Sequence, residues 1–184
     1  MKRPLLLAAL LLVLAACSGH TVHRVEVDFL SFVPQANRSG PLDLTTAQVR
    51  VPDDPAGQLV QVPGAEALLD GRVVAKAEVR NTGTLPAQVD LEVRMAPQND
   101  TDLYDGTGGD LEAKKVSLSL NPGETGTLDL SLDLAPGNPA FDLVKSGAFR
   151  IGARLSLSGE KVDYTLTQGE VSLRLKLFNL IPTP

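Results

Sequence analysis

Few side chains in this sequence suit nucleophilic or metal chemistry, and they lie close together near its start. Cys17 is the single cysteine, and the two histidines are His20 and His23. A serine nucleophile needs a histidine held rigidly beside it, and a zinc site usually needs three or four histidine or cysteine ligands. The pair His20-x-x-His23 offers only weak chelation. The sequence therefore predicts no metal, no cofactor and no catalytic residues, in a protein that is not an enzyme.

The Asp- and Gly-rich segment 99–110 is the other place where ligand-type side chains gather. Several oxygen ligands around glycines are typical of Ca²⁺ sites. Asp100 and Asp102 match the first and third positions of an EF-hand loop, but Gly106 comes one place late and no glutamate occupies the twelfth position. We therefore interpret the segment as a solvated connection between two strands. Because the chain contains 22 Asp and Glu residues, a pair of catalytic carboxylates elsewhere stays an open alternative.

An apolar run precedes Cys17. A basic pair comes first, residues 5–14 are all Leu, Ala or Val, and two small alanines separate this run from Cys17. This order of basic, apolar and small residues is typical of a secretory signal. The run is shorter than the roughly twenty residues that a membrane-spanning helix needs, so a permanent transmembrane helix is the weaker alternative. The other alternative is a plain secreted protein with an unmodified Cys17.

The segment Leu14-Ala15-Ala16-Cys17 resembles the lipobox of bacterial lipoprotein signals. The resemblance implies that a signal peptidase recognises Leu14, Ala15 and Ala16, cuts off residues 1–16 and leaves Cys17 as the lipidated first residue. Two or more acyl chains hold a protein stably at a membrane. Lipidation consumes the only thiol, so the resemblance also implies a mature chain without disulfides.

The residue after the cysteine bears on which membrane holds the protein. In Gram-negative lipoproteins an aspartate at that place often retains the protein in the inner membrane, whereas this chain has Ser18. The resemblance therefore implies a lipid-anchored protein of the bacterial cell envelope, facing the periplasm from the outer membrane where the host has one. Its expected partners are that membrane and other envelope proteins.

Composition narrows the classes of partner further. The formal net charge of −5 disfavours binding to nucleic acid. Aromatic residues make up 4% of the chain and tryptophan is absent, whereas carbohydrate platforms and base-stacking surfaces need more rings. We therefore expect no nucleic-acid partner.

The part of the chain that follows the predicted signal and tether is predicted to form β-strands. From residue 24 on, apolar and polar residues alternate with a period of two, which is typical of strands with one buried face. We expect strands at 24–33, 72–80, 85–95, 116–120, 128–134, 149–157, 162–166 and 171–177. Residues 45–51 and 58–62 are further candidates for short strands. Gly169 is expected to form the last turn. Residues 139–146 are expected to form a short helix with Asn138 as its N-cap.

These strands predict an all-β protein, an immunoglobulin-like antiparallel β-sandwich of about seven to nine strands with one short helical turn. The expected organisation is a signal at 1–16, a tether at 17–23 and a single β-sandwich domain at 24–181, in which 34–71 is partly loop. The apolar run 175–181 is expected to be a final strand and its trailing cap. An exposed edge of this kind can accept an added partner strand.

Two turn segments carry a second resemblance. Val79-Arg80-Asn81-Thr82-Gly83 closes one predicted strand, and Leu120-Asn121-Pro122-Gly123-Glu124 precedes another. This layout is similar to that of the immunoglobulin-like, adhesion-related modules of bacterial surface proteins. The chain is also similar to lipid-anchored sandwiches akin to water-stress proteins. These likenesses imply a binding or structural role at the cell surface.

Taken together, these features favour a lipid-anchored, non-enzymatic envelope protein whose β-sandwich serves binding, assembly or support. The alternative is a carrier that holds a small or lipidic ligand between its sheets. A third hypothesis is an enzyme that acts through carboxylates. A closed core would rule out the carrier, and a cleft with two converging carboxylates would favour the enzyme.

Overall fold

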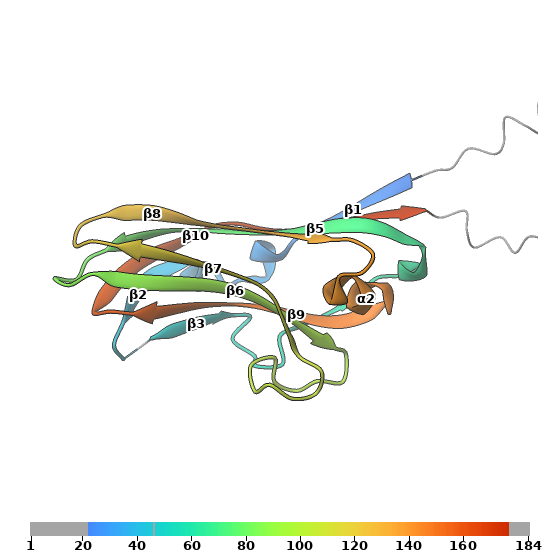
Figure 1. The fold of residues 1–184 in the computed structure, drawn as a ribbon, viewed down its shortest axis with the longest axis horizontal. Helices are drawn as coiled ribbons and strands as arrows, with labels where there is room; N and C mark the ends of the chain where they lie inside the picture. Colours follow the sequence, from blue (N-terminus) through green and yellow to red (C-terminus); the bar gives the residue numbers. More distant parts are fainter. Residues whose placement is uncertain (1–21, 46, 177–184) are drawn as a thin grey trace, which may run out of the picture.

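The computed structural model describes residues 22–45 and 47–176, which form two antiparallel sheets packed face to face (Figure 1). Sheet A contains β1 (Val22–Asp28), β2 (Ser39–Asp43), β5 (Leu68–Asn81), β8 (Thr125–Leu134) and β10 (Lys161–Lys176). Sheet B contains β3 (Gln48–Val51), β4 (Gln58–Gln61), β6 (Ala87–Pro97), β7 (Leu111–Leu120) and β9 (Ala148–Ser158). The prediction of an all-β sandwich is confirmed.

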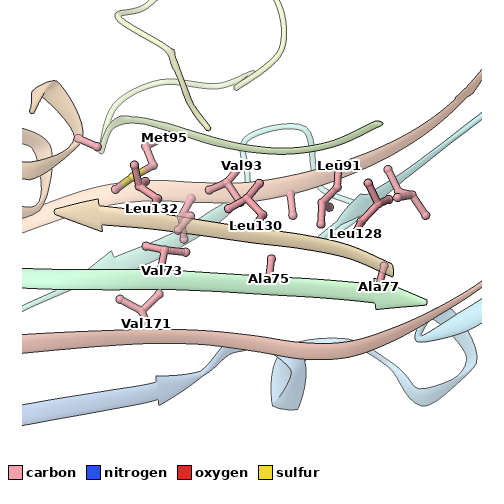
Figure 2. Close-up of a cluster of buried hydrophobic side chains, with 14 of the residues drawn as sticks. Val73, Ala75, Ala77, Leu91, Val93, Met95, Leu128, Leu130, Leu132 and Val171 are labelled. Carbon is pink, nitrogen blue, oxygen red and sulfur yellow. The ribbon is translucent and has the colours of Figure 1, made fainter. Parts of the chain in front are cut away.

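The alternating residues place the core between the two sheets. Figure 2 shows Val73, Ala75 and Ala77 of β5 on one side of this core and Leu91, Val93 and Met95 of β6 on the other, all of them buried. The intervening polar residues lie on the outer face of sheet A, where ion pairs join neighbouring strands, such as Arg72 with Asp133 at 2.7 Å and Lys76 with Asp129 at 2.9 Å. The hydrophobic period therefore decides which face of each strand is buried.

The predicted short helix is confirmed as α2 (Pro139–Lys145). The Asn138 side chain accepts a hydrogen bond from the Ala140 N–H at 2.9 Å, and Phe141 and Val144 are buried. The helix connects β8 of sheet A to β9 of sheet B, and it covers the end of the sandwich where β1 begins and β10 ends (Figure 1). Within the described residues, no helix is long and apolar enough to span a membrane.

The two turn segments singled out in the sequence meet at Asn81, whose side chain is buried. Its Nδ2 group donates hydrogen bonds to the carbonyls of Leu85 (2.9 Å) and Leu120 (3.0 Å), and its Oδ1 accepts one from the Gly83 N–H (2.9 Å). Asn81 therefore ties the β5–β6 turn to the end of β7, at the end of the sandwich away from α2 (Figure 1). A buried amide with this many partners stabilises the local backbone.

One predicted turn is wrong. β10 runs without a break from Lys161 to Lys176, so Gly169 lies inside a strand, next to a bulge between Leu166 and Gln168. A Cβ atom on Gly169 would lie 2.5 Å from Cε2 of the Phe29 ring. Only glycine leaves room for the aromatic ring, which packs directly on the strand backbone. A glycine within a strand pattern can therefore indicate a close approach as well as a turn.

Both sheets have an interrupted edge. β1 and β2 pair with the same side of β10, and the 3₁₀ turns η1 (Phe29–Phe32) and η2 (Gln35–Asn37) lie between them. β3 and β4 likewise pair with the same side of β9. The described residues contain ten strands, where the sequence predicted about seven to nine. β2 was not predicted, and the predicted strands 162–166 and 171–177 are both part of β10. The divided edge of sheet A also ends the predicted strand 24–33 at Asp28, whose carboxylate caps η1 by accepting from the Leu30 N–H.

Candidate functional site

An apolar cavity of about 150 Å³ lies between the sheets, next to the divided edges. Its walls come from β1 and β10 of sheet A, from β4 and β9 of sheet B, and from the segment that follows β4. Both β1 and β4 pair with a neighbour on one side only, and no described strand lies between them. The sandwich is therefore open along this side, whereas β7 and β8 close the opposite side.

The alternation of the two edge strands turns apolar side chains toward this opening. Val25 and Val27 of β1 line the cavity, as does Val60 of β4. Val25 is 37% exposed, which places it at the rim. Phe149 and Leu173 are buried and form part of the floor. A ligand in the cavity would therefore exchange water for hydrocarbon on every side except the mouth.

Phe29 forms the inner end of the cavity. Its ring packs on Gly169 and lines both this cavity and a second one of about 20 Å³ farther along the sandwich. The Asp28 cap holds the turn that carries the ring. One long seam between the sheets is thus divided into two cavities. The division is made by Phe29, by Gly169 beneath its ring and by the bulge at Leu166 and Gln168.

The chemistry of the cavity wall is simple. None of the residues that line it is ionisable, and the only polar side chains among them are Gln58 and Gln61. A wall of this kind supplies no general acid, base or nucleophile. A dry cavity of about this volume is large enough for one small apolar group such as an aromatic ring. The arrangement can bind hydrocarbon, but it cannot perform acid–base chemistry.

The Asp- and Gly-rich segment 99–110 is only in part the solvated connection that the sequence predicted, since Asn99, Thr101 and residues 105–109 are exposed. It does connect β6 to β7, but it folds back onto the outer face of sheet B, where Leu103 is fully buried against Gly57 and Gly152. Asp100 is also buried, and its Oδ1 accepts from the Asp102 N–H at 2.9 Å. What the prediction missed is that a single apolar residue, Leu103, anchors an otherwise polar loop.

The carboxylates of this segment bind backbone amides and arginines. Asp105 accepts from the Thr107 N–H at 2.7 Å, and Asp110 pairs with Arg94 at 3.0 Å. In the part of the chain that the structure describes, no group of three or more His, Cys, Asp or Glu side chains is placed to hold a metal ion. The segment therefore acts as a lid on sheet B, and we call it the 99–110 lid.

Under this lid lies a charged cluster around Tyr104 that sequence reasoning missed. The guanidinium carbons of Arg50 and Arg154 lie 4.8 and 4.7 Å from the centre of the Tyr104 ring, within range of cation–π attraction. Arg50 and Arg154 are direct cross-strand neighbours on β3 and β9, where like charges repel. Glu92 offsets this repulsion, because its Oε1 lies 2.5 Å from Arg154 Nη2.

Burial raises the pKa of Tyr104 to about 12, and the neighbouring Arg154 opposes this shift. The Tyr104 hydroxyl is buried without a hydrogen-bond partner among the described residues and lies close to Gly152. The one sequence signal for this cluster is Gly152, which interrupts an otherwise regular apolar strand and leaves room for the ring.

The residues predicted to carry the anchor lie outside the described part of the chain. These are Leu14, Ala15, Ala16 and Cys17, together with His20, whereas His23 is exposed on β1. Five residue steps separate Cys17 from Val22, the first residue of β1. Such a segment spans at most ~18 Å when fully extended. A lipid on Cys17 would therefore hold the cavity end of the sandwich close to the membrane.

Comparison with protein families supports this anchor. Residues 1–18 match the model of the prokaryotic membrane lipoprotein lipid attachment site. The match covers the predicted signal together with Cys17 and Ser18, and it supports a lipid-anchored bacterial membrane lipoprotein. No curated protein matches the chain significantly. The adhesion-module resemblance stays a prediction.

The sandwich is similar to parts of several solved structures. A chain of infectious bursal disease virus, strain Gx, is 7% identical with a TM-score of 0.43, over 86% of this chain and 34% of that chain. Latent apple tyrosinase is 14% identical with a TM-score of 0.37, over 72% and 27%. The xylan-binding domain CBM22-1 of Paenibacillus barcinonensis Xyn10C is 12% identical with a TM-score of 0.30, over 57% and 55%. This chain thus spans about a third of the viral chain. At TM-scores below 0.5, these likenesses carry no argument about function.

Proposed function

We propose that this protein is a lipid-anchored, non-enzymatic component of the bacterial cell envelope whose β-sandwich binds or supports other envelope components. The observation that carries the proposal is the lipid attachment match at residues 1–18, followed almost at once by a folded strand at Val22. A short tether of this kind restricts the sandwich to partners at or near the membrane surface. The signal peptidase would recognise Leu14, Ala15 and Ala16, and Cys17 would carry the lipid.

The charged residues support a non-enzymatic role. The buried carboxylates Glu92 and Asp110 each contact an arginine, and the acids of the 99–110 lid hold backbone amides. A glycosidase-type pair would need two carboxyl groups facing a shared cleft. The cavity between the sheets contains no carboxylate at all in its lining.

A second candidate function is that of a carrier for a small or lipidic ligand between the sheets. The open apolar cavity beside β1 and β4 favours it, since a closed core would have left no space for a ligand. In this function the anchor would keep the cavity within reach of molecules in or on the membrane.

Metabolic labelling with a radioactive fatty acid tests the anchor. The parent chain should incorporate label, whereas Cys17→Ala should incorporate none and keep its signal. Ser18→Ala is the matched control and should label normally. Labelling of Cys17→Ala to the parent level would contradict the assignment.

The envelope role is tested by cross-linking the lipidated protein in intact cells and recovering it from envelope fractions. Recovery of one defined envelope protein would support the binding or structural role. Recovery without a protein partner, together with a small apolar molecule found by mass spectrometry, would favour the carrier. Ser18→Asp in a Gram-negative host adds a localisation test, because it should shift the protein from the outer to the inner membrane fraction.

A further inference from the structure

We propose that the cavity between the sheets is a site for one unbranched alkyl chain, which enters between β1 and β4 and leaves its polar end at the rim. This inference rests on the carrier function proposed above and names its ligand class. It is carried by the shape of the cavity, the composition of its wall, its opening and its position in the protein.

The lining is long and narrow. Along β10 it runs from Leu175 to Val171, and along β9 from Phe149 to Ala153. Each stretch covers four residue steps, or ~13 Å of strand. A volume of about 150 Å³ distributed over this length leaves room for the width of a single hydrocarbon chain.

The wall selects for hydrocarbon over polar ligands. It contains no ionisable side chain, so a charge inside it would be left without a partner. The two polar side chains of the lining, Gln58 and Gln61, are both exposed residues of the edge strand β4. They are placed to meet a carboxyl or ester group at the mouth, while methylene groups fill the interior.

The opening and the end of the cavity define a direction of entry. The rim residue Val25 lies on β1, three residues after its start at Val22, so the mouth lies near the tether and hence near the membrane. At the inner end the Phe29 ring, seated on Gly169, blocks the seam. A chain that enters from the mouth therefore stops at Phe29, and the cavity accepts a limited number of methylene groups.

A chain-length series measures this limit. The probes are saturated n-alkyl carboxylates of increasing length, kept below their micelle concentrations, and the protein is the chain from residue 17 on with Cys17→Ser, so that it carries no acyl chain of its own. We expect binding of one alkyl carboxylate per protein molecule in titration calorimetry. The affinity should increase about fourfold with each methylene group, until the chain reaches Phe29, and then stay constant.

Two neighbouring residues of β4 provide the matched variants. Val60 lines the cavity, whereas Leu59 is 38% exposed and is not part of the lining. Val60→Phe should fill the cavity and weaken binding at least tenfold, and Leu59→Phe should bind like the parent. If Val60→Phe does not fold, Val25→Asp at the rim replaces it, with the exposed Val22→Asp as its control.

Several outcomes would overturn the inference. One is an affinity that increases with chain length without a plateau, and another is unchanged binding by a folded cavity variant. Binding that emerges only after removal of residues 177–184 would assign the cavity to this chain's own apolar segment. If benzene binds but no alkyl carboxylate does, the ligand class is wrong while the carrier function survives. If neither binds, both fail. Native mass spectrometry of protein from envelope extracts then distinguishes a free fatty acid from a phospholipid as the source of the chain.

Discussion

Two regions of the molecule differ in chemistry and in whether a loop covers them. One is the cavity beside β1 and β4, and the other is the charged cluster beneath the 99–110 lid. The cluster around Tyr104 contains three arginines and the carboxylates of Glu92 and Asp110, residue types that are often found in active sites. None of the residues that line the cavity is of these types. Yet the chain covers the cluster with its own loop and leaves the cavity open. In this protein the open, uncovered cavity is therefore the better candidate for a binding site. The Tyr104 cluster is a weaker candidate, although it contains the more reactive residue types.

This contrast assigns the Tyr104 cluster a structural role. Arg94 pairs with Asp110 of the lid and donates to the Leu103 carbonyl, while Arg154 pairs with Glu92 beneath it. The arginines thus bind the lid to sheet B through several elements at once. If the cluster were a ligand site instead, changes in it would alter binding more than stability. The predictions below separate these two roles.

The largest effect is expected for Glu92→Ala. Its side chain is 5% exposed, and its loss leaves Arg154 without its carboxylate next to Arg50. Removal of one partner from a buried ion pair costs about 3 kcal/mol of unfolding free energy, measurable by urea denaturation. The control is Asp133→Ala, which breaks the exposed pair with Arg72 and should cost less than about 1 kcal/mol. Equal losses in both variants would mean that the lid does not bury the Glu92 pair.

Tyr104 is expected to act through its ring alone. Tyr104→Ala removes the ring that contacts Arg50 and Arg154 and should cost about 2–3 kcal/mol in the same measurement. Tyr104→Phe keeps the ring and deletes a buried hydroxyl that has no partner among the described residues, so it should leave stability unchanged or slightly increased. A large loss in the Phe variant would reveal an unseen partner for the hydroxyl and reopen the cluster as a ligand site.

On the cavity side, Gly169→Ala should cost about 2 kcal/mol. The added Cβ would lie 2.5 Å from Phe29 Cε2, so the ring must move. Because the ring forms the inner end of the cavity, we also expect the plateau of the alkyl series to shift to another chain length. Gly40→Ala is the matched control in the same sheet, since its Cβ would meet Tyr164 at an ordinary 3.9 Å. Comparable losses in the two variants would show that Phe29 is not seated on Gly169.

The raised pKa of Tyr104 adds a pH-dependent effect of similar size. Burial raises this pKa to about 12 from its usual value of 10.0, so between these values the unfolded chain releases the phenolic proton while the folded chain retains it. Stability from this group is complete below pH 10 and is lost as pH rises through 12. We expect Tyr104→Phe to lose about 2 kcal/mol less than the parent over this interval. Identical pH profiles would mean that the hydroxyl is hydrated in the folded state.

Sequence patterns predicted what depends on local periodicity and little of what depends on distant contacts. The alternating leucines of β8 and the Asn138 cap of α2 are local signals, and the structure confirms both. A glycine in a strand pattern indicates either a turn or a close approach, and only the position of Phe29 decides this for Gly169. The Tyr104 cluster unites residues from β3, β6, β9 and the lid, and the cavity depends on where two edge strands break. Apart from Gly152 at the Tyr104 cluster, neither feature has a local sequence signal.

The smallest effect is expected at the rim of the cavity, and it tests whether the mouth is open. Val25→Thr replaces a methyl group with a hydroxyl at a side chain that is 37% exposed, so water can solvate the hydroxyl and the loss of stability should stay below about 0.5 kcal/mol. Val93→Thr places the same hydroxyl in the buried part of the same lining and should cost about 1–2 kcal/mol. The ratio between the two variants, measured by urea denaturation, reports directly on access to the cavity. Equal costs would mean that another part of the chain covers Val25 in solution, and the contrast between a covered cluster and an open cavity would no longer hold.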